Sequence, residues 1–215
     1  MKKSLLGLVA LVFISSLWSS SALAVGIGGY VDVSGGSGEA EWDSDFQSWD
    51  IDASAAAFGF VLDTAPMNER TFNYRLNAGL AAQNFEDDLG VEMEAGGIYA
   101  ENIFGFALIR DENVRWWLGP LVRVGIYSGE TDPVNIGGGT QQIDFTYAEF
   151  GIGAVTGVNI NINDRLILAP SLGFRICGFA GTGEINEYVG GVHYYWEEDI
   201  SGGTTSAFAN FAVLF

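Results

Sequence analysis

The single histidine, His193, is the first residue to test for catalysis in this 215-residue chain. Nucleophilic catalysis needs a hydroxyl or thiol within hydrogen-bond reach of the imidazole, and a carboxylate that orients the ring. A serine two residues after the histidine would lie on the same face of a strand, but Tyr195 occupies that position. Ser201 together with Glu197 could replace it only through one particular loop fold. The sequence therefore predicts that the protein is not an enzyme.

Clusters of carboxylates are the second feature that could do chemistry, because Ca²⁺ and Mg²⁺ prefer oxygen ligands. Two short acidic segments supply the candidate cation-binding residues, which are Glu41, Asp43, Asp45, Glu86, Asp87 and Asp88. The first segment has the spacing of the start of an EF-hand loop, but the terminal Glu of that loop is missing. A solvated, negatively charged surface also explains these acids and is the favoured interpretation. The sequence thus predicts no cofactor, with loosely bound Ca or Mg at the acidic loops as the alternative.

Six further charged residues stand apart because they lie within segments of apolar and small residues. They are Arg75, Glu94, Glu101, Arg123, Glu149 and Arg175. If these side chains face a shared interior, opposite charges must meet there, because an unpaired buried charge costs several kcal/mol. Their role therefore depends on the elements that carry them.

The two ends of the chain indicate where those elements are located. Residues 1–24 have the two lysines, the apolar stretch and the small-residue site Ala22-Leu23-Ala24 of a cleaved secretory signal. The mature chain is then expected to be one domain, 25–215. At the other end, residues 204–215 alternate between two unlike faces, which predicts a strand. The more apolar of these faces consists of Phe215, Val213, Phe211, Ala209 and Ala207.

Composition excludes several classes of protein. Without Lys2 and Lys3, nine basic residues fall to seven arginines, against 27 carboxylates, so nucleic acid is not an expected partner. The apolar content of 48% and the aromatic content of 13% exclude a disordered chain. Cys177 is the single cysteine, so there is no intramolecular disulfide. Its thiol could face either lipid or the interior.

Strand-like alternation recurs in eight segments. Their approximate bounds are 26–34, 49–62, 71–84, 90–106, 114–128, 142–160, 165–179 and 204–215. Most connections alternate between short turns and long, Gly-rich, acidic loops. In the fourth segment the apolar residues move from one alternating set of positions to the other near Gly96 and Gly97, where a β-bulge is expected. No apolar run after the signal is as long as a membrane helix, so any membrane span must be made of strands.

The signal, the alternation, the loop asymmetry and the terminal Phe215 resemble the OmpA/OmpX-type family of small outer-membrane barrels. The resemblance implies an all-β fold, an eight-stranded antiparallel up-and-down transmembrane β-barrel in the bacterial outer membrane. It also implies contact with outer-membrane lipid and lipopolysaccharide, and recognition of Phe215, Val213 and Phe211 by the barrel-assembly machinery as an insertion signal. A soluble sandwich or lipocalin-like barrel is the alternative fold. The Gly-, Ala- and Ser-rich polar faces of the segments argue against it.

In such a barrel the charged residues would share the lumen. Arg123, Glu149, Arg175 and Glu94 lie at similar depth on neighbouring strands, which predicts a ring of alternating charge, with a lower pair between Arg75 and Glu101. An eight-stranded interior is only just wide enough for side chains, so the charges are expected to plug it.

The expected function is a structural or surface-interaction role through acidic extracellular loops. The alternative is a narrow gated pore for ions or small solutes. A lipid-modifying barrel enzyme is less favoured, because the His-x-Ser pair expected of a barrel that deacylates lipid A is missing.

Overall fold

The computed structural model describes residues 25–42, 48–67, 70–88, 90–163 and 165–215. The predicted signal at 1–24 and two of the cation-binding candidates, Asp43 and Asp45, lie outside the described residues. No helix in the described part of the chain is long and apolar enough to cross a membrane.

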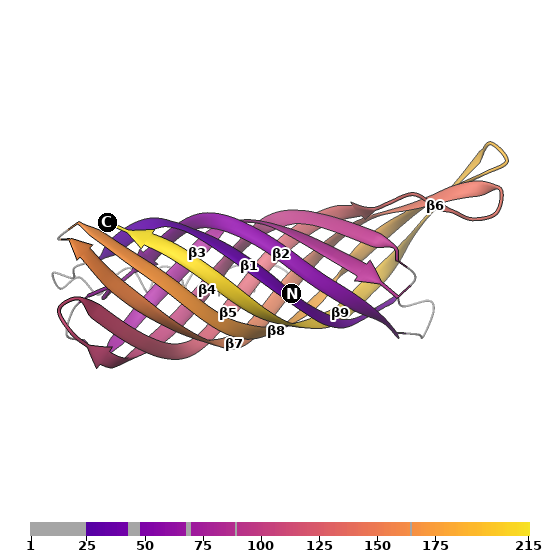
Figure 1. The fold of residues 1–215 in the computed structure, drawn as a ribbon. Helices are drawn as coiled ribbons and strands as arrows, with labels where there is room; N and C mark the ends of the chain where they lie inside the picture. Colours follow the sequence, from indigo (N-terminus) through magenta and orange to yellow (C-terminus); the bar gives the residue numbers. More distant parts are fainter. Residues whose placement is uncertain (1–24, 43–47, 68–69, 89, 164) are drawn as a thin grey trace, which may run out of the picture.

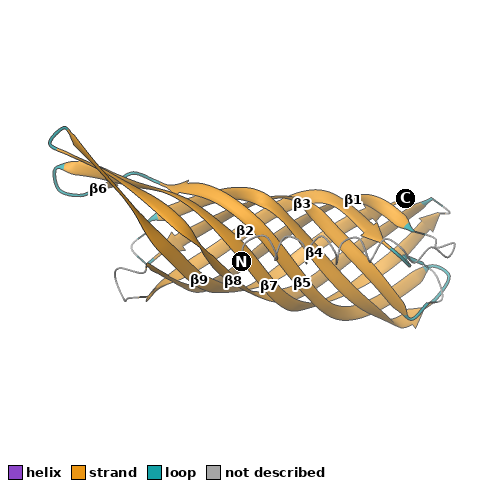
Figure 2. Cartoon of the chain, turned by 180° about the vertical axis from the view of Figure 1, so that it is seen from behind, coloured by secondary structure: helices purple, strands orange, loops and turns teal. Residues whose placement is uncertain are grey.

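Eight long antiparallel strands and one short strand form a single sheet (Figures 1 and 2). The strands are β1 Gly26–Trp42, β2 Ser48–Asp63, β3 Phe72–Asp87, β4 Glu92–Arg110, β5 Val114–Thr131, β6 Val134–Asn135, β7 Gly139–Asn163, β8 Leu166–Val189 and β9 Val192–Leu214. Each long strand pairs with the next long strand in the chain, and β1 pairs with β9, so the sheet closes into a ring. The predicted eight-stranded up-and-down barrel is confirmed.

The closure involves the last residue of the chain. Phe215 and Ile27 exchange backbone hydrogen bonds of 2.9 and 3.2 Å, which joins the C-terminus to β1. We call the end of the barrel that holds Phe215 the C-terminal end and the opposite end the loop end (Figure 1). Phe215 and Phe211 point outward and are exposed. Their role as an insertion signal remains a prediction.

Alternation sorts the side chains of each strand between lumen and exterior, as predicted. In β3, Arg75 and Gln83 are buried in the lumen, whereas Leu80 on the other face is exposed. Large apolar side chains on the exterior are exposed on every long strand, for example Phe58 and Ile98, each at 61%. We call this surface the apolar belt. Contiguous apolar surface of this extent is not stable in water and is suited to lipid.

Several strands extend further toward the loop end than predicted. β1 continues to Trp42 through residues expected to form a loop, and the predicted loop 180–203 is the upper part of β8 and β9. The two strands are joined by Gly190 and Gly191, whose φ angles are 59° and 82°. Two consecutive positive φ angles are typical of a tight type I′ hairpin turn, which continues a strand pair without a loop.

The bulge predicted near Gly96 and Gly97 was wrong. The pairing of β4 with β3 and β5 is continuous there, and the irregularity in β4 lies between Ala107 and Ile109. The apparent change of phase has a different cause. Beyond the apolar belt, outward residues such as Glu94 are polar, while inward residues such as Met93 are apolar. The polarity of the two faces is reversed although the strand itself is regular.

Candidate functional site

Five charged side chains from five strands meet inside the barrel. They are Asp32, Glu101, Arg123, Glu149 and Arg175, and we call them the ionic layer. Each of them is at least nine-tenths buried. The strand register brings them together, since Glu101 of β4 lies directly opposite Arg123 of β5. All five occupy inward positions of their strands, so alternation alone directs them into the lumen.

The two arginines of the ionic layer hold three carboxylates. Arg123 places Nε 2.7 Å from Glu149 Oε1 and Nη1 4.0 Å from Glu101 Oε2. Arg175 places Nη2 2.7 Å from Asp32 Oδ1 and Nη1 3.1 Å from the same Oε2 of Glu101. Glu101 therefore lies between the two arginines and links two short ion pairs into one network.

Aromatic and amide side chains enclose the ionic layer. The guanidinium carbon of Arg123 lies 3.8 Å from the ring centroid of Tyr99, and that of Arg175 lies 4.4 Å from the ring of Phe208. Gln83 donates a hydrogen bond of 3.0 Å to Glu149 Oε2 and accepts one from Tyr147. These contacts hold the charges in fixed positions and leave the arginines little room to move.

The structure corrects two pairings predicted from the sequence. Glu94 is exposed on the outer surface of β4 and takes no part in the ring, whose β4 carboxylate is Glu101. Arg75 pairs with Asp63 rather than with Glu101. Glu94 and Glu101 are an odd number of residues apart, so on a regular strand they face opposite sides, and only the bulge predicted near Gly96 and Gly97 would have turned both inward. The pairing of Arg75 was wrong because depth was counted along single strands, whereas the level at which tilted strands meet is set by their register. Asp32 was missed, although its position between the outward Val31 and Val33 signals an inward carboxylate.

A second polar cluster closes the C-terminal end of the lumen. Arg75 places Nη2 2.8 Å from Asp63 Oδ2 and also donates 2.8 Å to Asn159 Oδ1. Asn159 in turn donates 2.7 Å to the backbone oxygen of Pro66, in the turn between β2 and β3. The guanidinium of Arg75 lies 4.7 Å from the ring centroid of Trp117, and Arg75, Asp63 and Asn159 are fully buried. We call these five residues the base lock, because they attach the turn to the lumen wall.

Aromatic rings fill the lumen on the other side of the ionic layer. Tyr147 contacts four rings at centroid distances between 5.2 and 6.3 Å, those of Phe85, Tyr127, Phe145 and Phe179. We call these five residues the aromatic cap. Tyr147 lies one inward position beyond Glu149 toward the loop end, so the cap covers the ionic layer. Cys177 also faces inward and is buried, which settles the orientation of its thiol.

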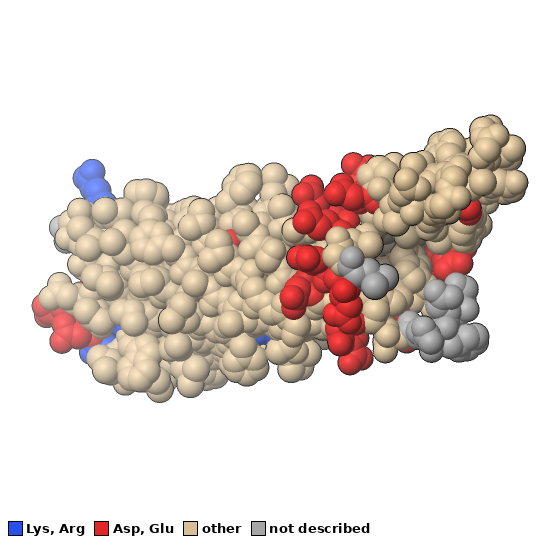
Figure 3. All heavy atoms as spheres, turned by 45° about the vertical axis from the view of Figure 1, so that its right-hand side comes forward, with Lys and Arg blue, Asp and Glu red and all other residues tan. Residues whose placement is uncertain are grey.

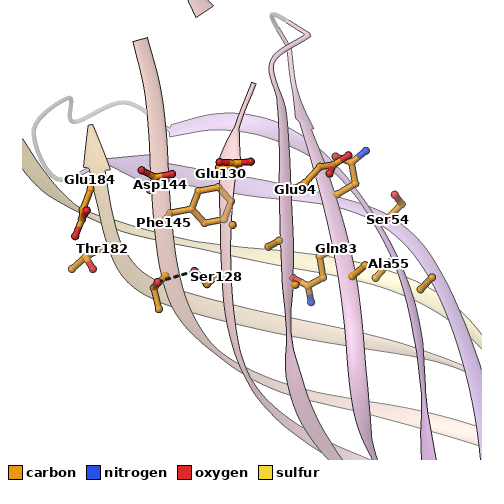
Figure 4. A pocket seen from close by; sticks show the side chains of 17 residues that line it. Ser54, Ala55, Gln83, Glu94, Ser128, Glu130, Asp144, Phe145, Thr182 and Glu184 are labelled. Atoms are coloured by element: carbon orange, nitrogen blue, oxygen red, sulfur yellow. Dashed lines mark hydrogen bonds between the residues drawn. The ribbon is translucent and has the colours of Figure 1, made fainter. Parts of the chain in front are cut away.

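A row of carboxylates runs around the outside of the barrel, just beyond the apolar belt (Figure 3). Glu94, Glu130, Asp144, Glu184 and Glu197 lie opposite one another on five successive long strands, and all five are exposed. Figure 4 shows four of them side by side above a groove of about 1080 Å³. We call this row the acidic girdle. Like charges directly opposite each other destabilise a sheet, so the acidic girdle lowers the stability of the barrel, and folding alone gives no reason for it.

The cation-binding candidates do not assemble into a site within the described residues. No group of three or more His, Cys, Asp or Glu side chains there is arranged to hold a metal ion. Glu41 accepts a hydrogen bond of 3.1 Å from Ser201, and Asp87 accepts one of 2.8 Å from the backbone of Val91. Glu86 and Asp88 are exposed at the loop end.

A projection continues the sheet beyond the barrel rim at the loop end (Figure 1), and His193, at the start of β9, belongs to it. The projection consists of β6 with the adjoining ends of β7, β8 and β9. The His193 ring stacks on Tyr188 at 4.5 Å, and its Nε2 lies 3.0 Å from Asn186 Oδ1. The partner of the imidazole is thus an amide, and Ser201 is bonded to Glu41 instead, so the parts of a catalytic triad are not brought together here.

Comparisons with known proteins find similarity only to solved structures. No protein-family model matches the chain, and no curated protein matches its sequence. The structure is similar to that of the outer membrane protein OprG from Pseudomonas aeruginosa, at 8% identity and a TM-score of 0.46, covering 87% of this chain and 96% of that one. It is also similar to Neisserial surface protein A, at 17% identity and a TM-score of 0.32, covering 85% and 96% of the two chains. A major outer membrane protein from Thermus thermophilus matches at 14% identity and a TM-score of 0.41, with 86% and 99% covered.

The fold itself identifies the class of protein. The ring of eight long strands is closed, so no backbone edge within it meets the hydrocarbon, and its exterior carries the apolar belt. Charged groups in the barrel wall are turned into the lumen, where they are paired. The chain is therefore a small eight-stranded outer-membrane β-barrel.

Proposed function

We propose that the protein acts at the cell surface as a closed barrel that presents the projection to a binding partner. The observation that carries this proposal is the projection itself, a stretch of sheet with exposed aromatic side chains and one edge that no described strand covers. The barrel serves as its rigid anchor in the membrane.

The closed lumen supports an anchoring role rather than transport. The base lock, the ionic layer and the aromatic cap occupy successive levels of an interior that is only just wide enough for side chains. A solute could pass only if all three levels rearranged. The narrow pore for ions or small solutes is the competing function.

Single-channel recording distinguishes these two functions. Wild-type protein whose folding is confirmed by its mobility on an unboiled gel is expected to give no current steps across a planar bilayer. Tyr147→Ala with Phe85→Ala should stay silent as well, because the ionic layer and the base lock still close the lumen. Stable current steps from folded wild-type protein at low voltage would favour the pore and contradict the closed barrel.

One edge of the projection is open to a further strand. β9 pairs with β1 only as far as Ile200 opposite Trp42, and from Val192 to Asp199 it pairs with β8 alone among the described residues. The backbone N–H and C=O of Phe215 point toward β1, with which they form hydrogen bonds. In a strand every second residue points its backbone groups to the same side, so the odd-numbered residues of β9 all point to the side on which β1 lies. Because the pairing of β9 runs without a register shift, the backbone groups of His193, Tyr195 and Glu197 point to the open edge. An unpaired edge of this kind is a template for strand addition.

The side chains around this edge indicate the chemistry of the partner. Tyr188, Val192, Tyr194 and Tyr195 are each at least half exposed, so a partner can bury apolar surface there. The charged side chains around the edge are negative, whereas His193 is the single basic residue there. The acidic residues are Glu184, Glu187, Glu197, Glu198 and Asp199. A second copy of the chain would bring the same negative charge. An extended segment of another protein, with apolar residues alternating with Lys or Arg, fits the edge better.

A backbone-specific variant tests strand addition. Tyr195→Pro removes an N–H that points to the open edge and leaves the pairing with β8 in place, since that N–H is not part of it. We expect it to weaken binding of a synthetic peptide of alternating Val and Lys at least tenfold. Tyr195→Ala, which keeps the N–H, should retain more of the affinity. Equal affinities for the two variants would show that the peptide is not held by the backbone edge, and no binding to wild-type protein would remove the proposed partner class.

We infer that the protein is not an enzyme, because His193 has an amide and a tyrosine ring as its neighbours and no nucleophile among its described contacts. Contact with outer-membrane lipid through the apolar belt and assembly through the machinery that inserts such barrels belong to the same proposal. The acidic girdle would face the headgroups of the outer leaflet.

A further inference from the structure

The ionic layer contains one more carboxylate than arginine. Asp32, Glu101 and Glu149 face Arg123 and Arg175, and every one of these side chains is at least nine-tenths buried. Fully ionised, the layer would hold one uncompensated negative charge in a lumen enclosed by lipid, which is strongly unfavourable. We infer that Glu101 binds a proton at neutral pH, so that the ionic layer is a proton-binding site. This inference concerns the lumen and does not depend on the proposed surface role.

The remaining titratable groups around the ionic layer do not supply the missing charge. They are Tyr30 of β1, Tyr99 of β4, Tyr127 of β5, Tyr147 of β7 and Cys177 of β8, and tyrosine and cysteine side chains are ordinarily neutral at pH 7. Tyr30 donates its hydroxyl hydrogen bond to Tyr99, and Tyr127 accepts one of 2.8 Å from Arg123. None of these five side chains can neutralise a carboxylate.

The other two lumen arginines are engaged or distant. Arg75 is held by Asp63 at 2.8 Å in the base lock. Arg115 lies eight residues before Arg123 on β5, roughly 26 Å of extended strand, and donates to Asn73 near the C-terminal end. An apolar cluster lies in the lumen between these two levels, formed by Ile103, Trp117, Leu121, Val155 and Phe208. The ionic layer must therefore balance its own charge.

The contact distances assign the proton to Glu101. Glu149 and Asp32 each have an arginine nitrogen at 2.7 Å, the length of a charge-assisted hydrogen bond. The shortest contact of Glu101 is 3.1 Å, to a guanidinium that already holds Asp32, and its contact with Arg123 is 4.0 Å. Arg123 with Glu149 and Arg175 with Asp32 thus form two complete ion pairs, which leaves Glu101 without an arginine of its own. Glu101 is 1% exposed, the lowest value among the three carboxylates.

Asn77 can accommodate either protonation state of Glu101. Its Nδ2 lies 3.3 Å from Glu101 Oε1, and its Oδ1 is buried and has no hydrogen-bond partner among the described residues. Rotation of the amide group by a half turn exchanges Nδ2 and Oδ1. Asn77 Oδ1 then lies against Glu101 Oε1 and can accept a hydrogen bond when Oε1 carries the proton. Release of the proton would leave three ionised carboxylates around two arginines, so the folded barrel should lose stability as the pH rises.

Infrared spectroscopy of the protein in lipid vesicles tests this assignment. A protonated carboxyl group has a C=O stretching band that a carboxylate lacks. At neutral pH we expect wild-type protein to show one such band, which disappears on alkalinisation, and Glu101→Gln to lack it. Glu39→Gln, which changes an exposed carboxylate, should keep the band. Glu149→Gln should lose it as well, because Arg123 is then free to pair with an ionised Glu101.

Unfolding measured against pH gives an independent readout. Because an unfolded glutamate releases its proton near about pH 4, the protonated Glu101 should make wild-type stability fall as the pH rises from there to neutral pH and above. Glu101→Gln, which resembles the protonated form, should fall less over the same range. Absence of the band in wild-type protein would overturn the inference even if no variant folds. Persistence of the band in Glu101→Gln, or identical stability profiles for wild type and Glu101→Gln, would overturn it too.

Discussion

Replacement of Arg175 by Met is expected to lower the free energy of unfolding by about 3–5 kcal/mol, the usual cost of breaking a buried ion pair from one side. Arg175 binds Asp32 at 2.7 Å and Glu101 at 3.1 Å, and all three side chains are buried. Without the guanidinium, Asp32 loses its only ion-pair partner in the described structure. Urea unfolding in lipid vesicles, followed by tryptophan fluorescence, would measure the loss.

The pH dependence of the Arg175→Met defect has a definite sign. A carboxylate without a counter-charge is stabilised by protonation, so the difference between variant and wild type should shrink as the pH falls. Arg165→Met is the matched control, because Arg165 is exposed in the turn before β8 and should change stability by well under about 1 kcal/mol. Equal stabilities of Arg175→Met and Arg165→Met would contradict the assigned role of the ionic layer.

The second large effect is expected at the base lock. Asp63→Ala removes the carboxylate that holds Arg75 at 2.8 Å and that accepts 3.0 Å from the backbone of Ala65. Arg75 is fully buried, so its charge would be left without compensation, again at a cost of about 3–5 kcal/mol. The turn 64–67 would also lose an anchor. Hydrogen exchange at Ala65 should therefore speed up in addition to the fall in unfolding stability.

A double variant separates the charge effect from the loss of packing. Arg75→Met combined with Asp63→Ala leaves no unpaired charge at this pair and should recover a large part of the stability lost in Asp63→Ala. Glu112→Ala, in the exposed turn between β4 and β5, is the control for changing an acid at the same end of the barrel. If the double variant is no more stable than Asp63→Ala, an unpaired Arg75 is not the cause of the defect.

Much of the barrel could be predicted from alternation. A period of two decides which side chains share a face, so the inward orientation of Arg75, Arg123 and Arg175 followed from their neighbours along the strand. The even number of strands and the apolar exterior followed in the same way. The projection was also indicated in the sequence, by the Gly190-Gly191 turn between two valines, a signal of a tight hairpin, so that residues 189–196 could be read either as a loop or as the extended ends of the last two strands.

The partners of these charges were decided by the tertiary structure. Alternation says nothing about the register between strands, and the register of a closed, tilted sheet determines which residues meet at one level. Asp63 rather than Glu101 therefore holds Arg75, and Glu101 lies between Arg123 and Arg175 instead. Asp32 and Arg175, 143 residues apart, are brought together by ring closure, which joins β1 to β9. By itself the sequence determined which face of its strand each of Arg75, Arg123 and Arg175 occupies, whereas only closure of the ring decided which charges meet, because pairing across the lumen depends on the register of all eight strands.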